Sequence, residues 1–584
     1  MAIKQKLHFF ISTLFSTKVF FPLLILFYLL NFFFNGEPFV RSDGFCYYQI
    51  SKSIINERNF ISTNEPEYWD YMGHVKETFN GNYISVCTPG TSLAILPGLA
   101  VANLLKGNAN IHNDFFIAYN GHTFAEGLSI LISAAVFSIL SWILIYKSLR
   151  LLGFSERNSW FSILAVFLSS YALWYVFILP AFTHTYEIFS VSLLLYSFIK
   201  IQQQKTQNLK IFFLCGLASG FTVITRPTLL PLVILVCLGI LIQKHPWKKM
   251  AVIVLAGLPF LFLYLSYNYI SYGNVFAIGY STVRNESFNL SHSYIFELLF
   301  SPLKGWFVFS PIYLFSVSGL ILFYKKNRSL SLICLIGIFS IALIYSFWSQ
   351  WWGGGSYGSR FMCFALPIGS IGLANFINYI KDKKQNIKII FLSLIVIFVF
   401  FSTAILFLYR VVDVNGSWFY SPFFLFKTEL NILKEVHSPS DLFRLHYQAI
   451  YEGSGILKLT IQDFPSTITV IETDNKDIEI KLFTPPNGIN YSFPQNLKYY
   501  LVASNTVYEG SIAIKDLPLL LNSNNDFLKT KTNLTFNKLP YDEFTGITLL
   551  KNQIKIYIER NKNIVIRGNQ IPLSNEEIEY VLTN

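Results

Sequence analysis

The sequence predicts a mainly α-helical membrane protein, a polytopic bundle of about eleven membrane-spanning helices followed by a β-rich extracytoplasmic domain. Hydrophobic residues make up 53% of the 584 residues and charged residues only 13%. The mean hydropathy of +0.45 is too high for a soluble protein of this length. Apolar runs of about twenty residues alternate with short Lys/Arg clusters up to Tyr409, and a more polar part follows.

The predicted spans are apolar runs long enough to cross the hydrocarbon core of a bilayer. They are Val19–Phe34, Thr123–Tyr146, Trp160–Phe177, His184–Ile199, Ile211–Thr225, Thr228–Ile242, Met250–Ile270, Phe307–Tyr324, Leu330–Trp348, Phe361–Ile380 and Ile389–Tyr409. The first run follows Lys4 and Lys6 as a signal peptide would. No small-residue cleavage site follows it, so we expect an uncleaved first helix.

One further apolar run, Ser92 to Leu105, does not fit as a full span. It is short, Pro97 and Gly98 interrupt it, and counting it as a span would move every later basic connection to the outside. We therefore expect an interfacial or re-entrant helix on the outer side.

Basic residues occupy every second connection between the spans. By the positive-inside rule, these connections and the N-terminus are cytoplasmic. The net charge of +12 therefore indicates orientation in a membrane, and no nucleic-acid-binding motif accompanies it. High Lys, Asn, Ile and Phe usage fits an AT-rich bacterial genome, so the cell (inner) membrane is the expected location.

Two domains follow from this pattern, residues 1–410 in the membrane and residues 411–584 outside the cytoplasm. The second part lacks long apolar runs and alternates apolar with polar residues, as in Leu457–Ile461, Ile478–Leu482, Tyr499–Val502 and Ile554–Ile558. Turn-forming residues stand at Pro485–Gly488. We expect a small β-rich domain, a sandwich, in which no functional motif is visible.

A candidate catalytic carboxylate, Asp43, lies just after the first span, in the external loop 35–91. Tyr47 and Tyr48 follow it. A carboxylate at the membrane surface can deprotonate an acceptor hydroxyl, and tyrosines can stack on a sugar or donate hydrogen bonds to it. The alternative is that Asp43 only caps a helix beginning near Tyr47.

Further polar residues lie at the predicted outer ends of spans. His184 and Glu187 share one helical face and can bind a metal, position an acceptor or simply satisfy each other. Arg226 and Lys304 suit a lipid phosphate, although basic side chains also snorkel to an interface without binding anything.

An aromatic and glycine-rich loop ends at another arginine. It contains Trp351, Trp352, three consecutive glycines, Tyr357 and Arg360. Glycines permit a close backbone approach to a ligand, and arginine can bind phosphate through two hydrogen bonds. An aromatic belt with an interfacial arginine is the alternative.

The six cysteines form no metal-binding motif. Four of them, Cys215, Cys237, Cys334 and Cys363, lie in apolar runs and are expected to be inert. Cys46 and Cys87 share the first external loop, where a disulfide between them is one of two open alternatives.

Several of these blocks, in this order, resemble the membrane glycosyltransferases of the GT-C type, which include protein O-mannosyltransferases and lipid A aminoarabinose transferases. The resemblance covers roughly the first 410 residues. It is carried by Ser42–Gly44 with Tyr47 and Tyr48, Thr88–Thr91, Thr183–His184, Thr225–Pro227, Tyr272–Asn274 with Ile278–Tyr280, Phe300–Gly305 with Ser310–Pro311, and Trp351–Arg360.

The resemblance implies a sugar donor carried on polyprenyl phosphate, an acidic base in the first external loop, and basic residues on the lipid phosphate. Asp43 matches the position of the base. The paired Asp and Glu of some members is not visible, so metal dependence is open and a divalent cation remains a candidate cofactor. The sugar, which decides between a hexosyl- and a pentosyltransferase, and the acceptor are not implied.

The leading hypothesis is an inverting transfer in which Asp43 activates an acceptor hydroxyl and Arg226 or Arg360 stabilises the departing lipid phosphate. The expected partners are the lipid-linked donor, membrane lipids and an extracytoplasmic glycan, lipid or protein acceptor. A transporter or flippase of lipid-linked glycans is one alternative, although no repeat of helix groups is visible. A non-catalytic envelope-assembly protein is another, although anchoring needs fewer helices.

Overall fold

A computed structural model gives the arrangement of the chain. It describes Thr17, Pro22, Val40 and residues 43–62, 75–78, 82–108, 118–119, 122–204, 208–284, 286–301, 304–353 and 357–412, followed by the backbone of short strands between 456 and 583. The first predicted span, Val19–Phe34, lies outside the described residues apart from Pro22. The chain divides into two compact units. They are Met1–Ser301 with Gly305–Gly353 and Gly358–Thr403, and Pro302–Lys304 with Gly354–Tyr357 and Ala404–Asn584.

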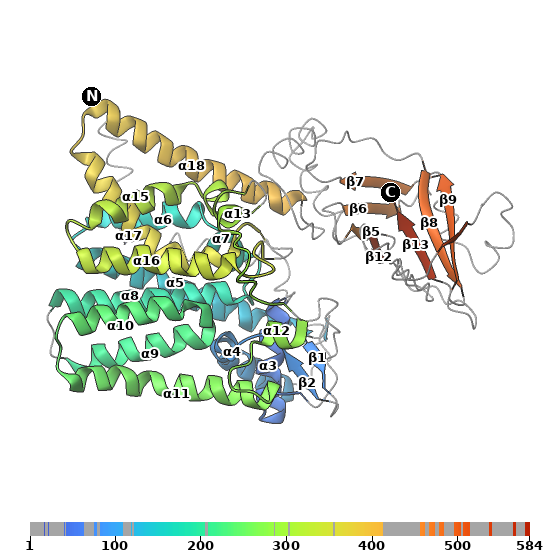
Figure 1. The fold of residues 1–584 in the computed structure, drawn as a ribbon, viewed down its shortest axis with the longest axis horizontal. Coiled ribbons are helices and arrows are strands. Elements are labelled where there is room, and N and C mark those ends of the chain that lie inside the picture. Colours follow the sequence, from blue (N-terminus) through green and yellow to red (C-terminus); the bar gives the residue numbers. More distant parts are fainter. Residues whose placement is uncertain are drawn as a thin grey trace. The chain divides into compact units, whose positions relative to one another are not determined.

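The first unit is mainly helical, with long helices packed side by side (Figure 1). Its longer helices are α5 (Phe124–Leu151), α6 (Glu156–Leu168), α8 (Thr183–Gln204), α9 (Leu209–Thr225), α10 (Leu230–Ile242), α11 (Trp247–Tyr272), α15 (Ile312–Phe323), α16 (Arg328–Ser346), α17 (Leu366–Lys381) and α18 (Gln385–Val412). Among the described residues, five helices are long and apolar enough to cross a membrane. The chain is therefore a membrane protein; the count of about eleven spans stays a prediction.

Two of the predicted spans are broken. Trp160–Phe177 becomes α6 and the short α7 (Ala172–Phe177), and Phe307–Tyr324 becomes α14 (Trp306–Phe309) and α15. Pro311 precedes α15 and has no N–H to continue the ladder from α14, which accounts for the second break. The run Ser92 to Leu105 forms part of a continuous 20-residue helix, α4 (Pro89–Asn108), which passes through Pro97 without ending.

Close helix packing in the first unit depends on glycines. A Cβ at Gly319 of α15 would overlap the carbonyl oxygen of Gly372 in α17, and one at Gly216 of α9 would overlap the carbonyl oxygen of Ile253 in α11. Small residues let helix backbones approach in this way in membranes, where burial of apolar surface does not drive helices together.

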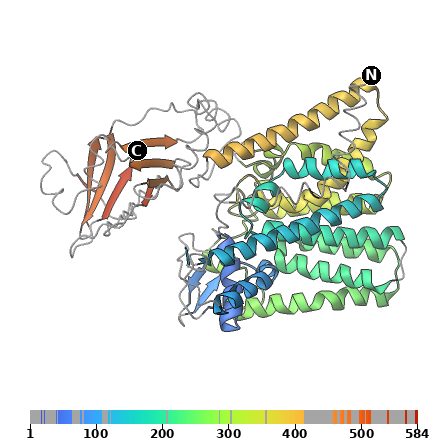
Figure 2. The same cartoon turned by 180° about the vertical axis from the view of Figure 1, so that it is seen from behind.

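The segments before α5 gather with α12 (Gly279–Arg284) at one end of α9 and α11, as both views show (Figures 1 and 2). They are α3 (Asp43–Glu57), α4 and the antiparallel pair β1 (Val75–Glu77) and β2 (Tyr83–Ser85). A disulfide between Cys46 and Cys87, with a Cα–Cα distance of 5.9 Å, ties α3 to the chain after β2. Of the two alternatives for these cysteines, the structure has the paired one.

The polar C-terminal part contains two antiparallel four-stranded sheets. Their orders are β10-β9-β8-β13 and β12-β5-β6-β7. The strands are β5 (Ile456–Ile461), β6 (Thr467–Glu472), β7 (Ile478–Phe483), β8 (Asn496–Ala503), β9 (Thr506–Ala513), β10 (Asn537–Leu539), β12 (Ile564–Arg567) and β13 (Glu579–Thr583). Three of the predicted alternating segments fall on β5, β7 and β8. The fourth, Ile554–Ile558, lies outside the described residues. The domain boundary at residue 410 and an extracytoplasmic sandwich stay predictions.

Candidate active site

Asp43 and Arg360 form an ion pair in the first unit. Arg360 Nη1 donates to Asp43 Oδ2, and the two side chains are 13% and 11% exposed. Asp43 is the first residue of α3, and Arg360 opens the 3₁₀ helix η3 (Arg360–Ala365) that leads into α17. Because α3 begins at Asp43 and not near Tyr47, the alternative of a cap preceding Tyr47 does not describe this geometry.

A second ionic group surrounds Glu187, which is fully buried. His184 Nδ1 lies 2.9 Å from Glu187 Oε1, and Arg226 Nη1 donates to Glu187 Oε2 at 2.7 Å. Arg226 Nη1 also lies 3.0 Å from His184 Nδ1. A single ring nitrogen either donates or accepts, so His184 Nδ1 can serve only one of these neighbours at a time.

The local sequence explains how Arg226 reaches this position. It precedes Pro227, which disfavours helical backbone at the preceding residue, and its φ and ψ of −152° and 98° are extended. Helix α9 therefore ends there. The Arg226 Nε–H donates to the hydroxyl of Tyr345 at 2.6 Å, and that hydroxyl shares a second hydrogen bond of 2.6 Å with Thr228 Oγ1.

The ring of Phe361 connects the two arginines. Its centroid lies 5.3 Å from Arg226 Cζ and 5.6 Å from Arg360 Cζ, and it stacks on Tyr345 at 4.2 Å with an interplanar angle of 2°. Cations are attracted to aromatic faces, so the aromatic pair offsets part of the repulsion between two buried guanidinium groups.

Threonines bring further blocks of the resemblance to the same place. Thr91 Oγ1 donates to Thr183 Oγ1 at 2.9 Å, and Thr88 Oγ1 donates to the carbonyl oxygen of Thr225 at 2.9 Å. A Cβ at Gly90 would lie 2.5 Å from Thr225 Cα, so only glycine permits this approach of α4 to α9.

Two tyrosines, Tyr47 and Tyr280, lie close to these charged residues. Tyr47 lies beside the hydroxyl of Thr183 and within electrostatic range of Asp43, Arg226 and Arg360. Burial raises the pKa of Tyr47, and the negative charge of Asp43 raises it further. The pKa of Tyr280, on α12, is raised by burial and by Asp43 in the same way. Both phenols therefore stay neutral and can donate hydrogen bonds over the physiological pH range.

Among the described residues, His184, Glu187 and Cys363 offer ligand atoms within 4.8 Å of one another, all buried. This arrangement does not suit a metal cation, because the guanidinium of Arg226 already forms an ion pair with Glu187 and contacts His184. A metal would have to displace that positive charge. Cys363 nevertheless lies at the site, which its apolar sequence context did not indicate.

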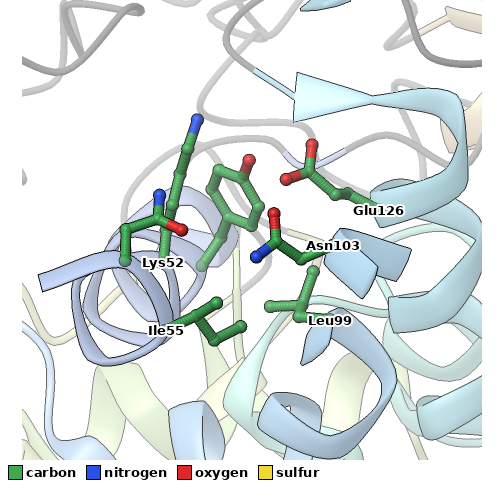
Figure 3. A pocket seen from close by; sticks show the side chains of 7 residues that line it. Lys52, Ile55, Leu99, Asn103 and Glu126 are labelled. Atoms are coloured by element: carbon green, nitrogen blue, oxygen red, sulfur yellow. The ribbon is translucent and has the colours of Figure 1, made fainter. Parts of the chain in front are cut away.

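The remaining predicted residues are described by their own neighbours. Tyr48 lines a pocket with Lys52, Ile55, Asn56, Leu99, Asn103 and Glu126 (Figure 3). Trp351 stacks on Tyr294 at 5.9 Å and meets Trp352 edge to face at 6.0 Å. Lys304 and Tyr357 belong to the second unit and are each 2% exposed. The structure thus gathers Asp43, Tyr47, His184, Glu187, Arg226 and Arg360, which we call the ionic cluster.

Sequence reasoning missed Tyr345, Phe361 and Thr228 as partners of the arginines. Tyr345 lies near the end of an apolar run and carries no local signal. Phe361 and Thr228 are next to Arg360 and Pro227, so their proximity to the site could have been inferred from sequence distance alone. Tyr280 was part of a quoted block without being singled out.

Comparison with known proteins returns solved structures only. No family model and no curated protein sequence matches the chain. It is similar to ArnT from Cupriavidus metallidurans bound to undecaprenyl phosphate, with 11% identity, a TM-score of 0.41, and coverage of 69% of this chain and 67% of that one.

It is also similar to an archaeal oligosaccharyltransferase from Archaeoglobus fulgidus, solved with zinc and sulfate. The identity is 15% and the TM-score 0.37, over 70% of this chain and 53% of that one. The archaeal oligosaccharyltransferase AglB from Archaeoglobus fulgidus, solved with an inhibitory peptide and a dolichol-phosphate, is similar too. Its identity is 14% and its TM-score 0.36, over 70% of this chain and 56% of that one. The chain thus spans just over half of these archaeal proteins. At identities of 11 to 15% and TM-scores of 0.36 to 0.41, these similarities assign neither a family nor a residue correspondence.

Proposed function

We propose that this protein is a membrane glycosyltransferase that moves a sugar from a polyprenyl-phosphate-linked donor to an extracytoplasmic acceptor. The observation that carries the proposal is the ionic cluster, in which Asp43, Arg226 and Arg360 converge from three distant segments of the first unit. An acid beside two arginines suits a reaction in which a hydroxyl loses a proton while a phosphate leaves.

The arginines supply the leaving-group site. Arg226 is fixed by Glu187 and Tyr345 through Nη1 and Nε, so its planar group is held before any ligand arrives. Guanidinium binds phosphate through paired hydrogen bonds and stays charged when buried. Negative charge that develops on the departing polyprenyl phosphate would be stabilised at Arg226 without reorganisation of that side chain.

Asp43 is the base in this mechanism, and its pairing with Arg360 gives the step an order. A donor phosphate would compete with Asp43 for Arg360. A carboxylate takes up a proton more readily once a neighbouring cation has moved away. Asp43 would then accept the proton of the acceptor hydroxyl, whose oxygen bonds to the anomeric carbon as the bond from that carbon to the phosphate oxygen breaks. One direct displacement inverts the anomeric centre.

The position of the cluster argues against a transporter of lipid-linked glycans. Thr183 opens α8, Arg226 follows α9 and Arg360 precedes α17, so the site lies at helix ends. Transporter sites typically lie near the bilayer midplane. We further propose about eleven spans in the cell membrane, a cytoplasmic N-terminus and an extracytoplasmic C-terminal domain, on the basis of the positive-inside pattern.

Binding of undecaprenyl phosphate to the purified protein tests this function. Arg226→Lys and Arg360→Lys should each weaken binding and slow transfer about tenfold or more, because lysine cannot reproduce the paired hydrogen bonds of arginine. Arg328→Lys is the matched control, since Arg328 is exposed at the start of α16. Native mass spectrometry measures the binding. The transfer of radiolabelled sugar in membranes measures the activity. Wild-type behaviour of both site variants would remove the arginines from the mechanism.

A further inference from the structure

A second group of buried polar residues lies next to the ionic cluster and has no role in the mechanism above. Among the described residues, three of its atoms have no hydrogen-bond partner: Trp306 Nε1, Tyr313 OH and Ser359 Oγ. These residues and Ser310, whose hydroxyl lies against that of Tyr171, are 0 to 1% exposed. Buried polar atoms are nearly always paired in native proteins, so several unpaired atoms in one place indicate a missing occupant.

These residues form one cluster, which we call the hydroxyl–indole cluster. The rings of Trp306 and Tyr313 have their centroids 4.8 Å apart. The hydroxyl of Tyr171 donates to the carbonyl oxygen of Trp306 at 3.0 Å and lies beside Ser310 and Ser359. The cluster therefore brings together α14, the start of α15, the break between α6 and α7, and the residue before η3.

Glycine 358 holds Ser359 in place. Its φ of +55° is in the left-handed region, and a Cβ there would overlap the ring of Tyr171. A side chain at this position would push the backbone away from Tyr171, and Ser359 would move with the backbone. The close approach is therefore part of how the cluster is built.

The hydroxyl–indole cluster adjoins the ionic cluster. Ser359 directly precedes Arg360. The thiol of Cys363 has its sulfur within 4.8 Å of ligand atoms of His184 and Glu187, and it is also within electrostatic range of Tyr171 and Tyr313. A ligand whose phosphate lies against the arginines would thus have a neutral polar neighbourhood within reach.

The chemistry of this neighbourhood indicates the ligand class. It offers hydroxyl groups and an indole N–H, which can donate and accept hydrogen bonds but carry no charge, between aromatic faces. A phosphate needs positive charge and an acyl chain needs no hydrogen bonds. A sugar ring, with several hydroxyl groups and apolar C–H faces, matches both features of the cluster.

We propose that the hydroxyl–indole cluster binds the sugar of the lipid-linked donor, holding its hydroxyl groups while Arg226 and Arg360 hold the phosphate. This inference rests on the proposed function and adds to it a sugar-recognition site that decides which donor is used. Ordered water is the competing occupant of the same space.

The test uses substitutions that remove an unpartnered atom and little else. Tyr313→Phe and Ser359→Ala should leave the melting temperature of the free protein unchanged, because no protein hydrogen bond is lost. Each should keep wild-type affinity for undecaprenyl phosphate but bind undecaprenyl phosphate-linked sugars about three- to tenfold more weakly. The probes are undecaprenyl phosphate linked to glucose, galactose, mannose, N-acetylglucosamine or aminoarabinose. The change in affinity is measured with the probe that binds the wild-type protein most tightly.

Tyr186→Phe is the matched control. Its hydroxyl is also buried, but it lies near Ser133 and its ring packs on Phe137 at 5.2 Å, among residues outside the cluster. It should change neither affinity.

Three results would overturn the inference: equal weakening for the sugar-free and sugar-bearing lipids, no weakening for any sugar, or a lowered melting temperature with unchanged affinities, which identifies water as the occupant. If wild type binds neither lipid, the proposed function itself fails; if it binds undecaprenyl phosphate alone and the variants behave like wild type, only the sugar site fails.

Discussion

The carboxylate of Asp43 has two roles in the structure that a single substitution separates. It balances the charge of Arg360, and it is the proposed base. Asp43→Asn preserves size and one hydrogen-bond acceptor for Arg360, but removes the capacity to take up a proton. Transfer should fall about a hundredfold or more, the scale typical of general-base loss, when assayed with polyprenyl-phosphate-linked sugar in membranes matched for protein level.

Binding and stability measurements on the same Asp43→Asn protein separate catalysis from folding. Removing one partner of a buried ion pair can destabilise a protein by several kcal/mol, roughly 3 to 5. A drop in melting temperature together with lost undecaprenyl phosphate binding would mean that Asp43 acts through structure. Near-normal transfer by the Asn variant would exclude it as the base.

At the residue scale, the sequence predicted the members of the ionic cluster better than their pairing. Arg226 stands out because ionisable residues at span edges are costly. Asp43 stands out as a carboxylate at the membrane surface, and Arg360 as an arginine that ends a glycine-rich loop. Nothing local indicated that Asp43 would meet Arg360, which is 317 positions away. Tyr345 was missed because a tyrosine at the end of an apolar run is ordinary, and only the fold turns its hydroxyl toward Arg226.

At the scale of elements, the contact between α15 and α17 depends on glycine. A Cβ at Gly319 would overlap the backbone of Gly372, and backbone atoms cannot move aside as a flexible side chain can. Gly319→Val should therefore destabilise the protein by about 1 to 3 kcal/mol or more, seen as a lower melting temperature in detergent. Gly257→Ala is the control, because its nearest neighbour would be 3.3 Å away; equal stability of the two variants would contradict the packing described.

The disulfide should stabilise the segment that carries Asp43. Cys46 and Cys87 are 41 positions apart. In the chain-entropy model, closing a loop of this length lowers the entropy of the unfolded chain and so stabilises the folded protein by about 4 kcal/mol. Cys46→Ala with Cys87→Ala should lower the melting temperature, and a reductant should lower that of wild type but not that of the double variant. A reductant effect of equal size on both proteins would show that the bond has no such role.

The elements also show why apolar runs predict positions better than boundaries. Each described span was located from its run, because length and hydropathy follow from the bilayer. The breaks at Ser169–Tyr171 and Ser310–Pro311 depend on tertiary contacts, such as Tyr171 with Trp306, which no local pattern contains. Pro311 was a readable signal for one of the two.

At the scale of the whole molecule, several helices carry basic residues at one end and site residues at the other. Helix α8 opens with Thr183 and His184 and reaches Lys200 near its far end, and the segment from Arg360 through α17 ends at Lys381. The positive-inside rule assigns the basic ends to the cytoplasm. We therefore propose that the site lies outside, where a disulfide persists. This polarity stays a prediction from the charge distribution, which is visible without a fold.

The topology can be tested in intact cells with a membrane-impermeant maleimide. Ser291→Cys, in an exposed connection on the site side, and Gly488→Cys, in the C-terminal part, should be labelled without permeabilisation. Lys383→Cys, exposed between α17 and α18, should be labelled only after it. The three variants and the background control carry Cys237→Ser, because Cys237 is partly exposed, whereas Cys46 and Cys87 are paired and the other three cysteines are buried.

Each labelling outcome bears on the function as well as on the orientation. A polyprenyl-phosphate-linked sugar and an extracytoplasmic acceptor can meet Asp43 only if its end of the helices faces outside. Labelling of Lys383→Cys in intact cells would put the ionic cluster in the cytoplasm, where a glycosyl acceptor outside the cell could not reach it. Labelling of Gly488→Cys only after permeabilisation, with Ser291→Cys accessible from outside, would instead leave the site in place and move the C-terminal part to the cytoplasm. That arrangement requires either that α18 does not cross the membrane or that one more crossing follows it.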